Sequence, residues 1–219
     1  KGEIKNGEMD GFGVLTYPYD GKSIIGEWKD GKEWNTKHRK KDGTLIGKYE
    51  NGKWIVSLFV NVGGYGTFVT SSDGLSWTKR TFETSEGLSG VTYGNGLFVT
   101  VGSYGTILTS SDGLSWTKRT SGISDHLYGV TYGNGLFVTV GLGIILTSPD
   151  GISWTIRTSR KSDHLYGVTY GKGIFWTVGL GIILTSTDGI SWTKRTSETY
   201  NSLWEVTYGN GLFVTVGSY

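Results

Sequence analysis

The sequence predicts an all-β protein built from two different arrays of tandem repeats. Three observations lead to this prediction. Four tryptophans, Trp77, Trp116, Trp154 and Trp192, recur at intervals of 39, 38 and 38 residues. Short runs of β-branched and aromatic residues alternate with Asn-Gly and Asp-Gly pairs, which are strong hairpin signals. Glycine accounts for 37 of the 219 residues, and no segment has the clear pattern of an amphipathic helix.

Composition and charge exclude several classes of protein. No apolar run reaches 18 residues, so no transmembrane helix is predicted. The net charge is only +2, with 11 Lys and Arg against 9 Asp and Glu in residues 1–54 and 10 of each in residues 55–219. This balance predicts no nucleic-acid binding. Because cysteine is absent, there is no disulfide framework, thiolate nucleophile or cysteine-based zinc site.

Residues 1–54 carry the first repeat. Its three copies, Gly2–Gly7, Gly26–Gly31 and Gly47–Gly52, each end in Asn-Gly or Asp-Gly. Each copy therefore predicts a strand, a two-residue turn and a returning strand. The segments Gly11–Tyr17 and Gly43–Ile46 are predicted to be the partner strands.

This first segment resembles MORN repeats. The run Gly26–Lys32 reads Gly-Glu-Trp-Lys-Asp-Gly-Lys and is close to the family's signature, and Tyr17–Gly21 resembles its Tyr-Pro-Asp-Gly turn with one residue inserted. The resemblance implies a ladder of hairpins that contacts proteins or lipid headgroups, and it does not imply catalysis. The basic cluster Lys37–Lys41 has two interpretations: peripheral contact with anionic headgroups, or a solvated hairpin tip.

Residues 55–219 carry the second repeat. One copy predicts four strands, at roughly Leu88–Tyr93, Leu97–Val101, Thr106–Thr109 and Ser115–Thr120. A four-stranded unit that recurs every 38 or 39 residues predicts a β-propeller, or an arc of propeller blades. When each blade begins at the third strand of a copy, there are four complete blades, at residues 66–101, 105–140, 143–178 and 181–216, and an extra strand near Leu58–Val62.

Both ends of the chain bear on this interpretation. The chain begins at Lys1 rather than at Met, which we interpret as a processed or trimmed product. It stops within a repeat at Tyr219. We therefore expect that the natural protein continues, or that the ring is completed in another way such as oligomerisation.

The turn before the fourth strand reads Ser-x-Asp-Gly-x-Ser-Trp in four copies, at residues 71–77, 110–116, 148–154 and 186–192. Its carboxylate can accept backbone N–H groups, its glycine supplies a positive φ, and its tryptophan packs against neighbouring strands. We interpret the repeated side chains as structural: Asp73, Trp77, Asp112, Trp116, Asp150, Trp154, Asp188 and Trp192. The turn resembles the Asp-box of sialidase-like (BNR) propellers, with one residue fewer.

The copies differ most where the fourth strand connects to the next first strand. In a propeller these connections share a face with the turns between the second and third strands. The candidate ligand-binding or partner-binding residues on that face are Asp125, His126, Tyr128, Asp163, His164, Tyr166, Trp204 and Tyr104. The alternative is that they are ordinary strand-entry residues, half-buried between blades. The two Asp-His pairs predict no metal site, because adjacent residues on a strand point to opposite faces.

We expect no enzyme and no cofactor. Sialidase-like catalysis would require an arginine cluster, whereas most arginines of the long repeat recur at one outer-strand position. The leading hypothesis is a non-catalytic bacterial scaffold that mediates protein–protein interaction or self-assembly, and the alternative is a lectin-like surface protein that binds glycans. Separate, equivalent pockets around Tyr128, Tyr166 and Trp204 would favour glycans, and a continuous patch would favour a protein partner. The absence of cysteine favours an extracellular or periplasmic location, without excluding the cytoplasm.

Overall fold

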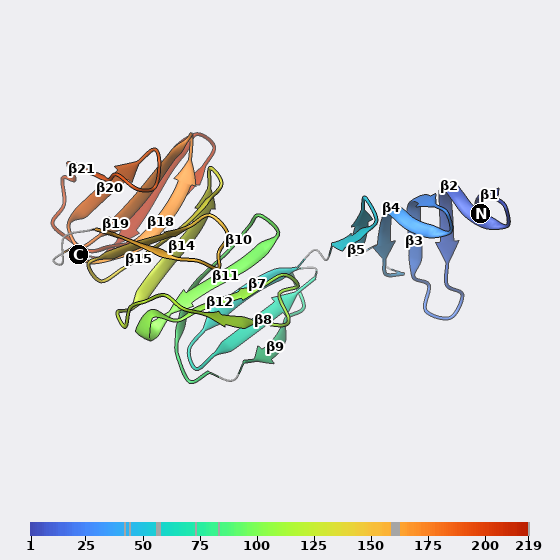
Figure 1. The fold of residues 1–219 in the computed structure, drawn as a ribbon, viewed down its shortest axis with the longest axis horizontal. Helices are drawn as coiled ribbons and strands as arrows, with labels where there is room; N and C mark the ends of the chain where they lie inside the picture. Colours follow the sequence, from blue (N-terminus) through green and yellow to red (C-terminus); the bar gives the residue numbers. More distant parts are fainter. Residues whose placement is uncertain are drawn as a thin grey trace. The chain divides into compact units, whose positions relative to one another are not determined.

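The structure is a computed structural model that describes residues 1–41, 43, 45–55, 58–72, 74–82, 84–158 and 163–218. The chain divides into two compact units, Lys1–Val60 with Val69–Lys79, and Asn61–Phe68 with Arg80–Tyr219. Figure 1 shows that the described chain is almost entirely β-structure. The domain boundary that the sequence predicts at residue 55 stays a prediction, because the adjoining Val56 and Ser57 lie outside the described residues.

The N-terminal sheet has six strands that pair in sequence order, each antiparallel to the next. Its strands are β1 (Gly2–Lys5), β2 (Glu8–Thr16), β3 (Ser23–Lys29), β4 (Lys32–Arg39), β5 (Leu45–Glu50) and β6 (Lys53–Ile55). The turns Asn6-Gly7, Asp30-Gly31 and Asn51-Gly52 have positive φ at both positions, so the three predicted hairpins are confirmed. The structure joins the first returning strand and the predicted partner strand Gly11–Tyr17 into the single strand β2.

The long repeat forms four-stranded antiparallel sheets, as the sequence predicts. Three sheets are complete, with strand orders β10-β11-β12-β13, β14-β15-β16-β17 and β18-β19-β20-β21. The first contains β10 (Leu88–Gly94), β11 (Leu97–Gly102), β12 (Ile107–Ser110) and β13 (Thr117–Arg119). The second contains β14 (Leu127–Gly133), β15 (Leu136–Gly141), β16 (Ile144–Ser148) and β17 (Thr155–Thr158). The third contains β18 (Leu165–Gly171), β19 (Ile174–Gly179), β20 (Ile182–Ser186) and β21 (Thr193–Arg195).

Two smaller sheets flank these three in sequence. Before them, β7 (Phe59–Gly63), β8 (Thr67–Ser71) and β9 (Thr78–Thr81) form a three-stranded sheet, and the predicted extra strand near Leu58–Val62 corresponds to β7. After them, β22 (Leu203–Gly209) and β23 (Leu212–Gly217) form a two-stranded sheet. The one helical segment of the described residues, the 3-10 turn η1 (Ser103–Gly105), is too short to cross a bilayer.

The division between sheets corrects the blade boundaries predicted from the sequence. The prediction began each blade at a third strand, whereas each sheet begins at a first strand, so the complete sheets span residues 88–119, 127–158 and 165–195. The reason is loop length. Only η1 and Thr106 separate β11 from β12, and this short turn returns the chain to the same sheet. The longer connection from Arg119 to Leu127 leads to the next sheet.

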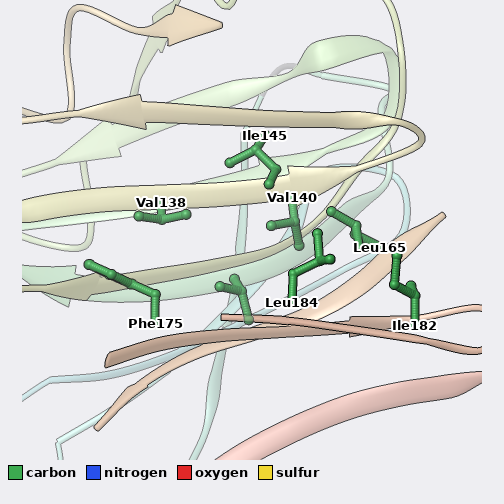
Figure 2. Packing of buried hydrophobic residues seen from close by; sticks show 8 residues of the cluster. Val138, Val140, Ile145, Leu165, Phe175, Ile182 and Leu184 are labelled. Atoms are coloured by element: carbon green, nitrogen blue, oxygen red, sulfur yellow. The ribbon is translucent and has the colours of Figure 1, made fainter. Parts of the chain in front are cut away.

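Successive sheets pack face to face through large apolar side chains. The first strands β10, β14, β18 and β22 lie side by side in that order. Between the second and third complete sheets, Val138, Val140 and Ile145 lie against Phe175 and Leu184, as Figure 2 shows. All five side chains are at most 6% exposed. Burial of this apolar surface is the main favourable term in sheet stacking.

Candidate functional site

Two kinds of loop meet on one face of the long repeat, which we call the loop face. The N–H of Gly105, in the turn between β11 and β12, donates to the carbonyl of Asp125 in the next connection at 2.7 Å. The same bond joins Gly143 to Asp163 at 2.8 Å. The turns and connections therefore share a face, as the sequence analysis expected.

Side chains from successive sheets form a continuous aromatic row on this face. The ring centroids are 5.4 Å apart between Tyr104 and His126, 6.2 Å between His126 and Tyr128, 5.4 Å between Tyr128 and Tyr166, and 4.6 Å between Tyr166 and Trp204. Tyr104 is 66% exposed and Trp204 is 49% exposed. The structure thus brings together five of the eight candidate residues, and each ring contacts the next one along the row.

A repeated bulge positions three of these rings. The register shifts between Leu127 and Gly129, so Tyr128 has no partner in the ladder, and Tyr166 and Trp204 lie at the equivalent shifts. A bulge redirects a side chain and increases local twist. The backbone carbonyl of the residue after each bulged residue accepts a hydrogen bond from a threonine hydroxyl of the neighbouring strand. In the second sheet this bond runs from Thr139 to Gly129 and is 2.8 Å long. The sequence analysis missed these bulges, although the glycine that follows each tyrosine was a usable signal.

The remaining three candidates, Asp125, Asp163 and His164, accept hydrogen bonds through their backbone carbonyls. The carbonyls of Asp125 and Asp163 accept the turn N–H groups described above, and the carbonyl of His164 accepts the N–H of Leu180 at 3.0 Å. The aromatic contacts of the described residues include His126 but not His164. Within the described parts of the chain, no three His, Asp or Glu side chains converge as a metal ion would require.

A cavity of about 290 Å³ lies among the first strands of all five sheets, and we call it the central cavity. Asn61 of β7, Ser89 of β10, Tyr128 of β14, Val168 of β18 and Glu205 of β22 line it. Tyr128 therefore belongs both to the aromatic row and to the wall of this cavity. Glu205 was not among the predicted residues.

The Asp-containing turns are closed by their own side chains. Asp150 accepts the Ser148 hydroxyl at 2.9 Å and the N–H groups of Ile152 and Ser153 at 2.8 Å each. Asp112 and Asp188 make the same three bonds in their turns. The first copy is described only in part, because Asp73 lies outside the described residues.

The same hydrogen bonds lower the pKa of the carboxyl groups. The N–H groups of Ser191 and Ile190 lower the pKa of Asp188 to about 2, and those of Ser153 and Ile152 lower the pKa of Asp150. Burial opposes the shift at Asp112, but the bonds from Ser115 and Leu114 outweigh it and its pKa is also lowered. These carboxylates therefore hold the turns together as anions.

The turn tryptophans pack between sheets. Trp116 stacks on Phe68 with centroids 4.6 Å apart. Trp154 packs against the buried apolar cluster that contains Val99, and Trp192 packs against the one that contains Val138. Trp77 is more exposed, at 46%. These positions are consistent with the structural interpretation of the repeated turn.

The basic cluster of the N-terminal sheet lies at the end of β4. Lys37 and Arg39 belong to the strand, and the Arg39 guanidinium donates to the carbonyl of Gly43 at 2.8 Å. Lys40 and Lys41 border a hollow of about 470 Å³ together with Lys22, which pairs with Asp20 at 2.8 Å. Contact with a membrane through this cluster stays a prediction.

Comparison with known proteins shows the fold. No family model matches the chain, and no curated protein matches it in sequence. Virginiamycin B lyase from Staphylococcus aureus is similar in structure, with a TM-score of 0.62 and 14% identity over 93% of this chain and 76% of that one. The structure of YCF48 bound to D1 peptide is similar with a TM-score of 0.54 and 15% identity, over 92% of this chain and 61% of that one. This chain therefore spans less than two thirds of YCF48. The computationally designed protein Ika8 is similar with a TM-score of 0.52 and 11% identity, over 93% of this chain and 67% of that one.

These similarities and the stacked four-stranded sheets define an all-β protein with the fold of β-propeller blades. At such low identities the similarity concerns the fold alone. An enzyme and proteins of other kinds share this architecture, so function has to be argued from the residues of this chain.

Proposed function

We propose that this chain is a non-catalytic repeat scaffold that binds a protein partner along the aromatic row. The observation that carries the proposal is the continuity of the row, from Tyr104 to Trp204 across successive sheets. A line of touching, partly exposed rings offers contact to an extended polypeptide, because tyrosine and tryptophan supply large contact areas at a low entropic cost. The contacts between neighbouring rings support a protein partner, whereas separate equivalent pockets would favour repeated glycan sites.

The arginines support a non-catalytic role. Arg119, Arg157 and Arg195 each donate from Nε to a threonine hydroxyl of the adjacent third strand, at 2.8, 3.0 and 2.8 Å. They are therefore used along the outer strands rather than gathered around a substrate carboxylate. A structural relative also suits the proposal, since YCF48 shares the fold and its structure contains a bound peptide.

Two further assignments belong to this proposal. We assign the N-terminal sheet to a MORN-like ladder, on the basis of its antiparallel hairpins and the Gly-Glu-Trp-Lys-Asp-Gly sequence of Gly26–Gly31. We assign the Asp-containing turns to a shortened Asp-box, on the basis of the three bonds made by each described aspartate. Both assignments describe scaffolds and add no catalytic residue.

The test is selection of a phage-displayed library of random linear peptides on the purified chain. Selected peptides should bind the wild type and lose most of their affinity for Tyr166→Ala and Trp204→Ala. Tyr19→Ala is the matched control, because Tyr19 is a fully exposed ring in the turn between β2 and β3. Failure to select any peptide, together with binding on a glycan array that Trp204→Ala abolishes, would replace the proposal with the lectin-like alternative.

A further inference from the structure

The first strands contain one departure from their repeat that the proposed function does not use. The residue that follows the bulge is Gly90 in β10, Gly129 in β14 and Gly167 in β18, but it is Glu205 in β22. The glycines are required by close packing: a Cβ at Gly129 would lie 2.8 Å from the carbonyl oxygen of Tyr166. The replacement of glycine by glutamate in one copy therefore adds a carboxylate where the first strands meet.

The geometry places this carboxylate in the central cavity. Glu205 lines the cavity, and its Oε1 accepts the N–H of Val206 at 3.0 Å. A Cβ built at Gly167 would lie 3.0 Å from the same oxygen, so the carboxylate lies against the neighbouring first strand. Asn61 and Tyr128 border the same space, and none of the described residues that line it is basic. The carboxylate thus has a backbone donor, but no cation beside it in the cavity wall.

The surrounding loops have the same sign of charge. Among the described residues of the connections on the loop face, four are acidic and none is lysine or arginine: Glu86, Asp125, Asp163 and Glu198. The lysines and arginines of β13, β17 and β21 lie instead on the outer strands. At one end of the row, however, Lys118 and Arg119 of β13 line a separate hollow together with Tyr104 and Asp125. The preference for a cationic group is therefore specific to the central cavity, whose described lining contains the Glu205 carboxylate and no basic residue.

We infer that the central cavity accepts the lysine or arginine side chain of the polypeptide that lies on the aromatic row. This inference rests on the proposed function and names the chemistry of the partner. The cationic group would pair with the Glu205 carboxylate, and its aliphatic stem would pass the ring of Tyr128, which belongs to both the cavity and the row. A volume of about 290 Å³ holds one such side chain with a few waters, and lies at the small end of the range for ligand pockets.

The test uses peptides selected from the random library on the full chain. Each peptide is resynthesised with arginine replaced by citrulline, or lysine by norleucine, and its affinity is measured for the wild type and for Glu205→Gln. We expect the neutral peptide to bind the wild type about tenfold more weakly than the charged one. This preference should disappear in Glu205→Gln and persist in Glu198→Gln, which removes an exposed carboxylate outside the cavity wall. It should also shrink as salt is raised.

The outcomes separate this inference from the proposed function. Peptides that depend on Tyr166 but contain no basic residue, or that bind equally well to Glu205→Gln, would overturn the cationic site and leave the aromatic row intact. Peptides that are indifferent to Tyr166→Ala and Trp204→Ala would overturn the proposed function and this inference together. If Glu205→Gln alters folding, its circular dichroism and thermal midpoint will differ from those of Glu198→Gln. The citrulline comparison on the wild type then decides the question.

Discussion

Replacement of Gly133 by alanine should destabilise the stacked sheets, whereas the same change at Gly209 should not. These glycines end equivalent first strands, β14 and β22. A Cβ at Gly133 would lie 2.6 Å from the Cβ of Tyr170 in the next sheet and closer still to its ring, whereas a Cβ at Gly209 would meet no atom within 4 Å. The pair therefore compares one substitution with and without a neighbouring sheet.

The magnitude follows from the atoms that must move. Tyr170 packs on Phe175, with centroids 4.7 Å apart, and Phe175 is fully buried in the core of Figure 2. A shift of the Tyr170 ring therefore disturbs that core, and overpacking of this kind costs about 1–3 kcal/mol. The corresponding fall in Tm is roughly 2–12 °C for a chain of this size. For Gly209→Ala we expect a change within about 0.5 kcal/mol of zero.

The assay is guanidinium denaturation followed by tryptophan fluorescence, with thermal unfolding as a second probe. Gly94→Ala and Gly171→Ala should behave like Gly133→Ala, because Tyr132 and Tyr208 occupy the equivalent space. Equal effects at Gly133 and Gly209 would refute the reasoning. That result would mean that the first strands do not pack against one another as the structure has them.

Two further predictions concern the turns and the bulges. The Asp188 pKa of about 2 lies below its unfolded value of 3.8, so its turn contributes stability above pH 3.8 that is lost as the pH falls toward 2. A variant with asparagine at positions 112, 150 and 188 should show a smaller loss of stability between pH 5 and pH 2, and an unchanged acid profile would contradict this account. Thr139→Val should lower the free energy of unfolding by about 1–3 kcal/mol, because it leaves the Gly129 carbonyl without its hydroxyl donor. Thr215→Val removes the equivalent bond at an exposed position and should lower the free energy of unfolding by less. Urea denaturation of the two variants measures both effects.

Much of the fold could be predicted because each copy repeats the same local chemistry. Asn-Gly pairs specify two-residue turns, and Asn95, Asn134 and Asn210 all have the positive φ that such turns need. The four strands of a copy follow from these turns and from the β-branched residues between them. The boundary between sheets did not follow, because in a periodic sequence every starting point gives the same pattern. Only the contrast between the tight turn at Ser103–Gly105 and the longer connection to Leu127 decides it.

The candidate site could be predicted only in part. Comparison of the copies found the rings of the aromatic row, since variable connections on a constant scaffold indicate contact residues. It did not distinguish His126, which joins the row, from His164, because the difference depends on whether Tyr104 or Leu142 occupies the neighbouring turn. Glu205 was missed because its significance lies in the cavity that all five first strands share. That cavity exists only after the sheets have stacked.

The central claim is that a polypeptide binds along the aromatic row, and chemical-shift mapping with a selected peptide tests it most directly. In ¹H–¹⁵N spectra of the full chain, we expect the largest changes at Tyr104, His126, Tyr128, Tyr166 and Trp204, with the indole N–H of Trp204 among them. The outer strands β13, β17 and β21 should change little. Changes that cluster on those strands or on the N-terminal sheet, with the aromatic row unaffected, would contradict the account.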